Sequence, residues 1–137
     1  MSTVSPSIDD RLATPVRDFM RPGVVTVPER ASLLQAKRAM VQHDTHAVLV
    51  VGGAGQPLGW VTADGLLRWL ERDLSSIPAG QAITEPPHRI EPLDTGRGAL
   101  EALAEPGVSH LLVCPAVDEP PLGVVAAIDI VDLVTRP

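Results

Sequence analysis

The hydrophobic pattern of the first half of the chain predicts alternating short helices and strands. Apolar residues recur on one helical face after Ser32, and Ser32 with Gln35 forms a capping box at the start of that helix. Two apolar runs flank the turn Gly52-Gly53-Ala54-Gly55, which indicates a β-hairpin. In chain order we expect a helical turn over 14–20 capped by Thr14, a strand at 24–27, a helix from 32 to about 43, hairpin strands at 45–51 and 57–62, and a closing helix with Leu66, Leu67, Leu70 and Leu74 on its apolar side.

The second half of the chain repeats this pattern at an offset of 64 residues. Without a gap, the offset places His46 on His110 and the triplet at 57–59 on the identical triplet at 121–123. The equivalent elements are a strand near 88–90, a helix from Asp94 as its cap to about 105, strands at 110–114 and 122–126, and a last helix.

This repeat predicts an α/β (α+β) fold of two tandem halves, each a small three-stranded sheet with two helices. Helices over one face leave the other face of such a sheet uncovered, so the two halves are expected to pack sheet against sheet. The predicted boundaries are a flexible N-terminal arm at 1–13, a first repeat at 14–74, a linker at 75–78 and a second repeat at 79–137.

Composition excludes several classes of function. A net charge of −6 without a lysine-rich run gives no basic surface for nucleic acid. No apolar run reaches the roughly 20 residues of a membrane span, and the first residues lack a signal-peptide pattern, so we expect a cytoplasmic protein without a membrane partner. Cys114 lies in an apolar run, and no nucleophile with a base is present, so no enzyme is predicted. The histidines, His43, His46, His88 and His110, lack metal-binding helical spacing, so no metal site is expected.

The motifs of the chain resemble those of the CBS family, whose repeats run V-x-D-x-M, a T-V-x-P strand, an A-x-x-x-M helix and a strand pair ending in G-h-h-T-x-x-D. The first half matches at 16–20, 26–28 and 59–62, and at Ala36 with Met40. The second half matches at 123–125 and 129–130, while its opening motif is replaced by 80–84. The resemblance implies two tandem CBS repeats about a pseudo-twofold axis, a homodimer, and adenosyl ligands such as AMP, ADP, ATP or S-adenosylmethionine.

The resemblance also implies two ligand sites, because the opening strand of one CBS repeat usually completes the site of the other. The motif threonine contacts ribose or phosphate, and the motif aspartate accepts hydrogen bonds from the ribose hydroxyls. Each half of this chain has lost one of these groups: Gly65 replaces the aspartate in the first, and Ala126 replaces the threonine in the second. The implied ligand-binding residues are Asp129, His110, Met20, Gly23 and Val25 in one site, and Thr62, His46, Thr84, Pro87 and Arg89 in the other.

Two functions follow from these site residues. One is a stand-alone regulatory module that senses an adenosine-type ligand, requires no cofactor and modulates a separate, unidentified partner protein. The alternative is a ligand-free dimerisation module with degenerate pockets, since one group is missing from each site. The histidines have an alternative role as hydrogen-bond partners of backbone carbonyls, and Arg89 as a solvated surface charge.

Overall fold

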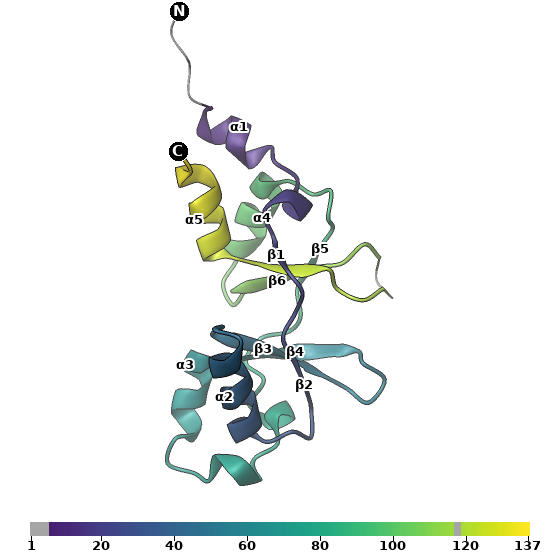
Figure 1. Ribbon diagram of the computed structural model, residues 1–137, viewed down its shortest axis with the longest axis vertical. Helices are drawn as coiled ribbons and strands as arrows, with labels where there is room; N and C mark the ends of the chain where they lie inside the picture. Colours follow the sequence, from purple (N-terminus) through teal and green to yellow (C-terminus); the bar gives the residue numbers. More distant parts are fainter. Residues whose placement is uncertain (1–5, 117–118) are drawn as a thin grey trace, which may run out of the picture. The chain divides into compact units, whose positions relative to one another are not determined.

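The computed structural model describes residues 6–116 and 119–137 (Figure 1). The chain forms two compact units: Val24–Pro87 make up one, here called the central unit, and the chain up to Gly23 joins His88–Pro137 in the other, here called the terminal unit. The fold class is α/β, as the sequence predicts. The boundaries of the two sequence repeats stay a prediction.

The central unit contains a three-stranded sheet of order β2-β3-β4. Strand β2 runs parallel to β3, and β3 and β4 form the predicted antiparallel hairpin. Val27, Leu33, Val48, Val50 and Val61 are among the buried residues of its core. Its elements are β2 (Thr26–Pro28), α2 (Leu33–Gln42), β3 (Ala47–Val51), β4 (Pro57–Thr62), α3 (Ala63–Leu66), and the 3₁₀ turns η2 (Leu67–Trp69), η3 (Leu74–Ser76) and η4 (Ala79–Ala82).

The terminal unit contains a four-stranded sheet of order β1-β7-β6-β5, one strand more than predicted. The additional strand arises because β1 pairs antiparallel with β7, with Arg21 opposite Val124. Leu12, Val16, Leu111 and Leu133 are in its core. Its elements are α1 (Ile8–Leu12), η1 (Val16–Asp18), β1 (Arg21–Pro22), β5 (Arg89–Ile90), α4 (Gly96–Leu103), β6 (His110–Val113), β7 (Gly123–Ala126) and α5 (Ala127–Thr135).

Helix α2 forms as its sequence predicts. The Ser32 hydroxyl accepts a hydrogen bond from the Gln35 backbone N–H at 3.1 Å, and the Gln35 side chain accepts one from the Ser32 N–H at 2.8 Å. These bonds satisfy two of the amides that a helix start leaves without partners. Leu33, Ala36 and Met40, the residues predicted to share one face, are all buried. The capping box and the apolar stripe therefore fix where this helix begins and which face it buries.

Replacing Ser32 by alanine is expected to lower the free energy of unfolding by about 1 kcal/mol, because it removes the acceptor that caps α2. Urea denaturation followed by tryptophan fluorescence measures the change. Ser32→Thr keeps a hydroxyl acceptor and should remain close to the wild type. Equal losses in the two variants would contradict a role for the cap.

Two predicted helix caps are wrong. The turn η1 begins after Pro15 with no side-chain cap, so Thr14 does not cap it. Helix α4 is capped by Thr95, whose hydroxyl accepts from the Gly98 N–H at 3.3 Å. The Asp94 carboxylate accepts instead from the Glu91 N–H at 2.9 Å and closes the preceding turn, because a short acidic side chain can bond to nearby backbone in either setting.

The closing helix of the first half also differs from the prediction. Helix α3 ends at Leu66 and continues as the 3₁₀ turn η2, where the period falls from 3.6 to 3.0 residues. Leu66 is buried, but Leu67 and Leu70 are 66% and 59% exposed, and Trp69 packs partly against the core in their place. The leucines at 67 and 70 therefore do not belong to the apolar side of this element.

Part of the segment predicted as a flexible arm is helical. Ser7 and Asp10 form a capping box at the start of α1, and the Leu12 side chain is 2% exposed within the core of the terminal unit. The Arg11 guanidinium also donates to the backbone oxygen of Leu133 in α5. Residues 6–13 are thus part of this unit, and the prediction for residues 1–5 lies outside the described residues.

Candidate functional site

The carboxylate of Asp129 is the centre of the candidate site in the terminal unit. Asp129 lies in the first turn of α5, and its side chain is 10% exposed. One carboxylate oxygen accepts from the Ala126 backbone N–H at 2.8 Å, and the other accepts from the Arg21 Nε at 3.0 Å. The first bond caps the helix, where the dipole also favours a negative charge. The carboxylate is therefore held in a fixed orientation at the start of α5.

Four of the five residues predicted for this site lie in the terminal unit. The Asp129 carboxylate accepts a hydrogen bond from the Ala126 N–H, and Ala126 lies opposite His110 in the antiparallel pair of β6 and β7. On the other side of β7, the Gly23 N–H donates to the Leu122 oxygen at 2.9 Å. Met20 approaches β7 closely, since a Cβ on Gly123 would lie 2.8 Å from the Met20 sulfur. Val25, the fifth residue, belongs to the central unit, where its carbonyl accepts from the Leu49 N–H.

The second predicted site centres on Thr62 in the central unit. The Thr62 hydroxyl accepts from the Gly65 N–H at 3.1 Å and so caps α3. Thr84 lies next to this cap, because a Cβ on Gly65 would lie 3.1 Å from the Thr84 methyl carbon. His46 is exposed, and its backbone carbonyl accepts a hydrogen bond from the Ala63 N–H at the start of α3.

The remaining two residues of the second site fall in different units. Pro87 is half-buried at the end of the central unit. Arg89 is exposed on β5 of the terminal unit. The structure thus brings Thr62, Thr84 and the His46 backbone together around the start of α3, and it places Arg89 on another sheet.

The two sites retain complementary halves of one capping motif. In a T-x-x-D box, a hydroxyl accepts from the amide three residues later, and the carboxylate accepts from the amide three residues earlier. The central unit keeps the first bond through Thr62, and the terminal unit keeps the second through Asp129. A Cβ on Gly65 would lie 3.1 Å from the Thr84 methyl carbon and 3.2 Å from the Thr62 hydroxyl oxygen, so a side chain there would crowd both neighbours. Of the two, only the Asp129 site has a carboxylate at the motif position.

Sequence reasoning missed Arg21 and Glu85. The Arg21 side chain is 57% exposed and pairs with Asp129. Glu85 is the equivalent of Arg21 at the offset of 64 residues, and it is buried. Its backbone forms an antiparallel β-bridge with Trp60 of β4, just as Arg21 lies opposite Val124 in the β1–β7 pair. The sequence does carry a signal for these two residues, because they place opposite charges at equivalent positions of the repeat. The charge at this position of the opening segment therefore differs between the two units.

A pocket of about 340 Å³ lies beside Arg89 in the terminal unit. Burial raises the pKa of the Cys114 thiol, and the positive charge of Arg89 acts in the opposite, weaker direction. A thiol with a raised pKa stays protonated and is a poor nucleophile. This pocket therefore lacks an activated cysteine. Its lining residues are Arg89, Ile90, Glu91, Asp94, Cys114 and Ala116.

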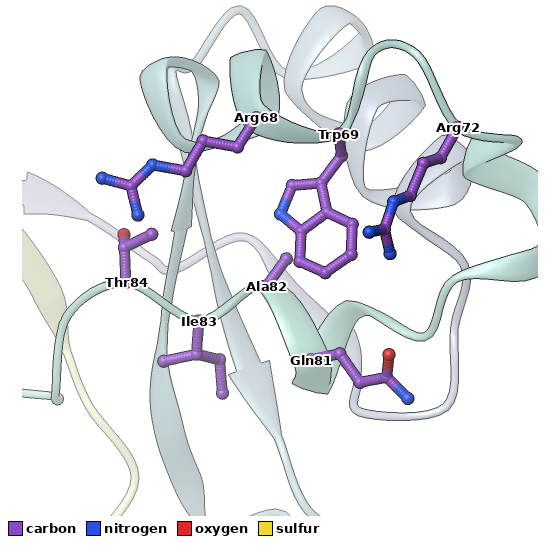
Figure 2. Close-up of a pocket in the computed structure, with 7 residues that line it drawn as sticks. All are labelled: Arg68, Trp69, Arg72, Gln81, Ala82, Ile83 and Thr84. Carbon is purple, nitrogen blue, oxygen red and sulfur yellow. The ribbon is translucent and has the colours of Figure 1, made fainter.

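A second pocket, of about 240 Å³, lies between η2 and η4 of the central unit (Figure 2). The ring of Trp69 lies between the side chains of Arg68 and Arg72 in this view, and the Arg72 guanidinium is 5.3 Å from the ring centroid. This distance is within the range of a cation–π interaction. Thr84 is the only residue of this pocket that the sequence singled out. The lining consists of Arg68, Trp69, Arg72, Gln81, Ala82, Ile83 and Thr84.

Among residues 6–116 and 119–137, no three His, Cys, Asp or Glu side chains are grouped so that they could hold a metal ion. Over the same residues, no helix has the length and apolar character required to cross a membrane.

The arrangement of elements matches known structures. Residues 16–72 match the family model of the CBS domain. The CBS domain of a bacterial CNNM/CorC family Mg²⁺ transporter in complex with ATP is similar with a TM-score of 0.79 and 22% identity, over 93% of this chain and 91% of that one. A CBS-domain protein from Agrobacterium tumefaciens gives a TM-score of 0.76 and 23% identity, over 89% and 94% of the two chains. The CBS domain of a CBS-domain-containing membrane protein from Sphaerobacter thermophilus gives a TM-score of 0.77 and 21% identity, over 92% of this chain and 91% of that one. No curated protein sequence matches the chain.

Residues 16–72 therefore match the CBS domain, and the chain has the fold of solved CBS-domain structures. This similarity confirms the fold that the motifs predicted. At these identities, the solved structures establish the fold alone. CBS domains generally act as binding or regulatory modules.

Proposed function

We propose that this protein is a cytoplasmic regulatory module that binds an adenosine-type ligand, such as AMP, ADP, ATP or S-adenosylmethionine, beside Asp129. The ligand would alter the activity of a separate partner protein, with no catalysis and no required cofactor. The observation that carries the proposal is the buried Asp129 carboxylate, fixed at the start of α5 and paired on its other oxygen with the exposed Arg21. A carboxylate in this position can accept hydrogen bonds from both vicinal hydroxyls of a ribose.

The pairing with Arg21 is compatible with ligand binding. Because the Arg21 side chain is 57% exposed, its ion pair with Asp129 is screened by water and is worth at most about 1 kcal/mol. Hydrogen bonds from ligand hydroxyls to a charged carboxylate contribute about 1.5–3 kcal/mol each, which exceeds the cost of displacing the arginine. A displaced Arg21 remains near the site and can pair with a phosphate group. The similar transporter CBS domain was solved with ATP, which supports an adenine nucleotide as the ligand class.

The test is calorimetric titration of the wild type and Asp129→Asn with adenosine, AMP, ADP, ATP and S-adenosylmethionine. Asparagine keeps an oxygen that can accept from the Ala126 N–H, but it loses the negative charge. The dissociation constant of the bound ligand should therefore rise about 10- to 100-fold. The matched control is Asp132→Asn, an exposed carboxylate on the same helix that pairs with Arg136. It should bind as the wild type does.

Two results would contradict the proposal. Equal affinity of Asp129→Asn and the wild type would place any binding elsewhere. The absence of heat with all five compounds would leave the second candidate function.

The second candidate is a ligand-free dimerisation module, and exposed apolar residues on the two closing helices favour it. Leu67 and Leu70 on and beside η2 are 66% and 59% exposed, and Ile128 and Val131 on α5 are 57% and 52% exposed. Apolar side chains of this size gain free energy when a second surface covers them. A homodimer through these residues also fits the first proposal. Sedimentation analysis of Leu70→Glu and Val131→Glu tests it, and both variants should be monomeric.

A further inference from the structure

The Asp129 carboxylate has a protein partner on each of its two oxygens. Oδ2 accepts from the Ala126 backbone N–H at 2.8 Å, and Oδ1 accepts from the Arg21 Nε at 3.0 Å. Because the side chain is only 10% exposed, little of the carboxylate remains for a further group. A ribose that donates from both vicinal hydroxyls needs access to both oxygens. It therefore competes with one of the two protein partners.

Of these two partners, Arg21 is the one that can give way. The Ala126 amide is backbone at the junction of β7 and α5, whereas the Arg21 side chain is long, flexible and 57% exposed. The main chain of Arg21 is held in place, since β1 pairs with β7 and the Gly23 N–H donates to the Leu122 oxygen at 2.9 Å. The guanidinium can thus leave the carboxylate while it stays beside the site.

The repeat of the chain provides an internal comparison for this pair. The offset of 64 residues aligns Asp129 with Gly65 and Arg21 with Glu85. The unit with a carboxylate in its closing helix has an arginine in the segment that pairs with its last strand, and the unit without that carboxylate has a glutamate there. If the fold itself required a cation at this position, both units would have one. The arginine is therefore matched to Asp129.

The charged groups on the neighbouring elements are paired with each other. In η1, the Arg17 guanidinium lies 3.7 Å from the Asp18 carboxylate. One turn further along α5, the Asp132 carboxylate lies 2.9 Å from the Arg136 guanidinium. These pairs largely balance their own charges. Arg21 is consequently the cation positioned to meet a negatively charged group beside Asp129.

We propose that Arg21 determines the ligand selectivity of the Asp129 site by competing with the ligand for the carboxylate. This inference rests on the proposed function and narrows its ligand class. Every ligand whose ribose binds Asp129 must first break the ion pair. A ligand with an anionic group next to the ribose gives the released guanidinium a new partner, whereas a neutral ligand leaves it in water. The site therefore selects adenosine-type ligands by charge.

The test is calorimetric titration of the wild type and Arg21→Gln with AMP and adenosine, which differ only in the phosphate group. The wild type should bind AMP more tightly. Glutamine removes the charge that competes for Asp129, so adenosine should bind up to about 5-fold more tightly to the variant. The loss of this competition is common to both ligands and cancels in their ratio. The preference for AMP should still fall about 10-fold, because the phosphate loses a charge-assisted donor.

Two further variants separate selectivity from a structural role. Arg21→Lys keeps the positive charge and should retain the preference for AMP. Arg17→Gln is the matched control, since Arg17 is exposed a few residues earlier and pairs with Asp18. It should bind both compounds as the wild type does. Far-UV circular dichroism in urea measures the stability of each variant. A purely structural role would lower the stability of Arg21→Gln and leave the ratio of the two affinities unchanged.

The possible failures are distinguishable. If both compounds bind and their affinity ratio is the same in the wild type and Arg21→Gln, this inference is overturned and the proposed adenosine site stands. If neither protein binds either compound, the proposed function fails, and the inference fails with it. Binding of adenosine to Arg21→Gln but not to the wild type would support the competition, because only the arginine differs.

Discussion

The Gly59→Ala variant is expected to lose about 3 kcal/mol of its free energy of unfolding, because this position has no room for a side chain. Gly59 adopts a φ of +156°, and a Cβ there would collide with the Ile83 side chain and lie 2.6 Å from the backbone oxygen of Glu85. That oxygen accepts a hydrogen bond from the Trp60 N–H at 2.9 Å. Relieving the collision would displace the segment from Ile83 to Glu85 away from β4.

Urea denaturation followed by fluorescence measures this loss, since both tryptophans, Trp60 and Trp69, belong to the central unit. Gly53→Ala is the matched control: a Cβ on Gly53 would meet no atom within 4 Å. Its stability should stay within about 0.5 kcal/mol of the wild type. A Gly59→Ala protein as stable as Gly53→Ala would show that the neighbouring segment shifts freely and that the close approach is unimportant.

The repeat of the sequence predicts where such close approaches occur, although it does not predict what lies against them. Gly123 is equivalent to Gly59, and a Cβ there would collide with the Arg21 backbone oxygen. In both units, therefore, a glycine of the repeated triplet lets an opening segment pass close to the last strand. The offset of 64 residues shows that the glycines are equivalent, but the contacting residues lie far away in the chain.

Local signals predicted most of the fold. The capping box of α2 and the glycine-rich turn between β3 and β4 act over a few residues, so the sequence determines them directly. The closing helix of the first half was harder to predict, because the choice between an α-helix and the 3₁₀ turn η2 depends on whether Trp69 or Leu70 packs on the core. Such packing competes with the periodic pattern and can override it.

The candidate site was predictable only in part for the same reason. Asp129 and Thr62 are motif positions, and both cap helices as short polar side chains do. Arg21 has no motif, and its link to Asp129 spans 108 residues of chain. The pair depends on the strand pairing of β1 with β7, which the sequence analysis did not include. The arginines at 68 and 72 stand in an element whose geometry was predicted incorrectly, so their common pocket was missed.

Leu12→Ala is expected to lower the free energy of unfolding by about 3 kcal/mol, which is the usual cost of emptying a buried leucine site. The Leu12 side chain is 2% exposed in the core that also contains Val16 and Leu133. The backbone next to it is held as well, since the Gly96 N–H donates to the Thr14 oxygen at 2.9 Å. Far-UV circular dichroism in urea is the appropriate measure, because the tryptophan fluorescence reports on the central unit.

The control is Ile8→Ala on the same short helix, where the side chain is 61% exposed and its loss should change stability by less than about 0.5 kcal/mol. The difference between the two variants separates a packed helix from a flexible arm. If α1 were only loosely attached, neither truncation would matter, and removal of residues 1–13 would also be tolerated. A large loss in Leu12→Ala alone means that the terminal unit needs the N-terminal helix to complete its core, so the unit is built from both ends of the chain.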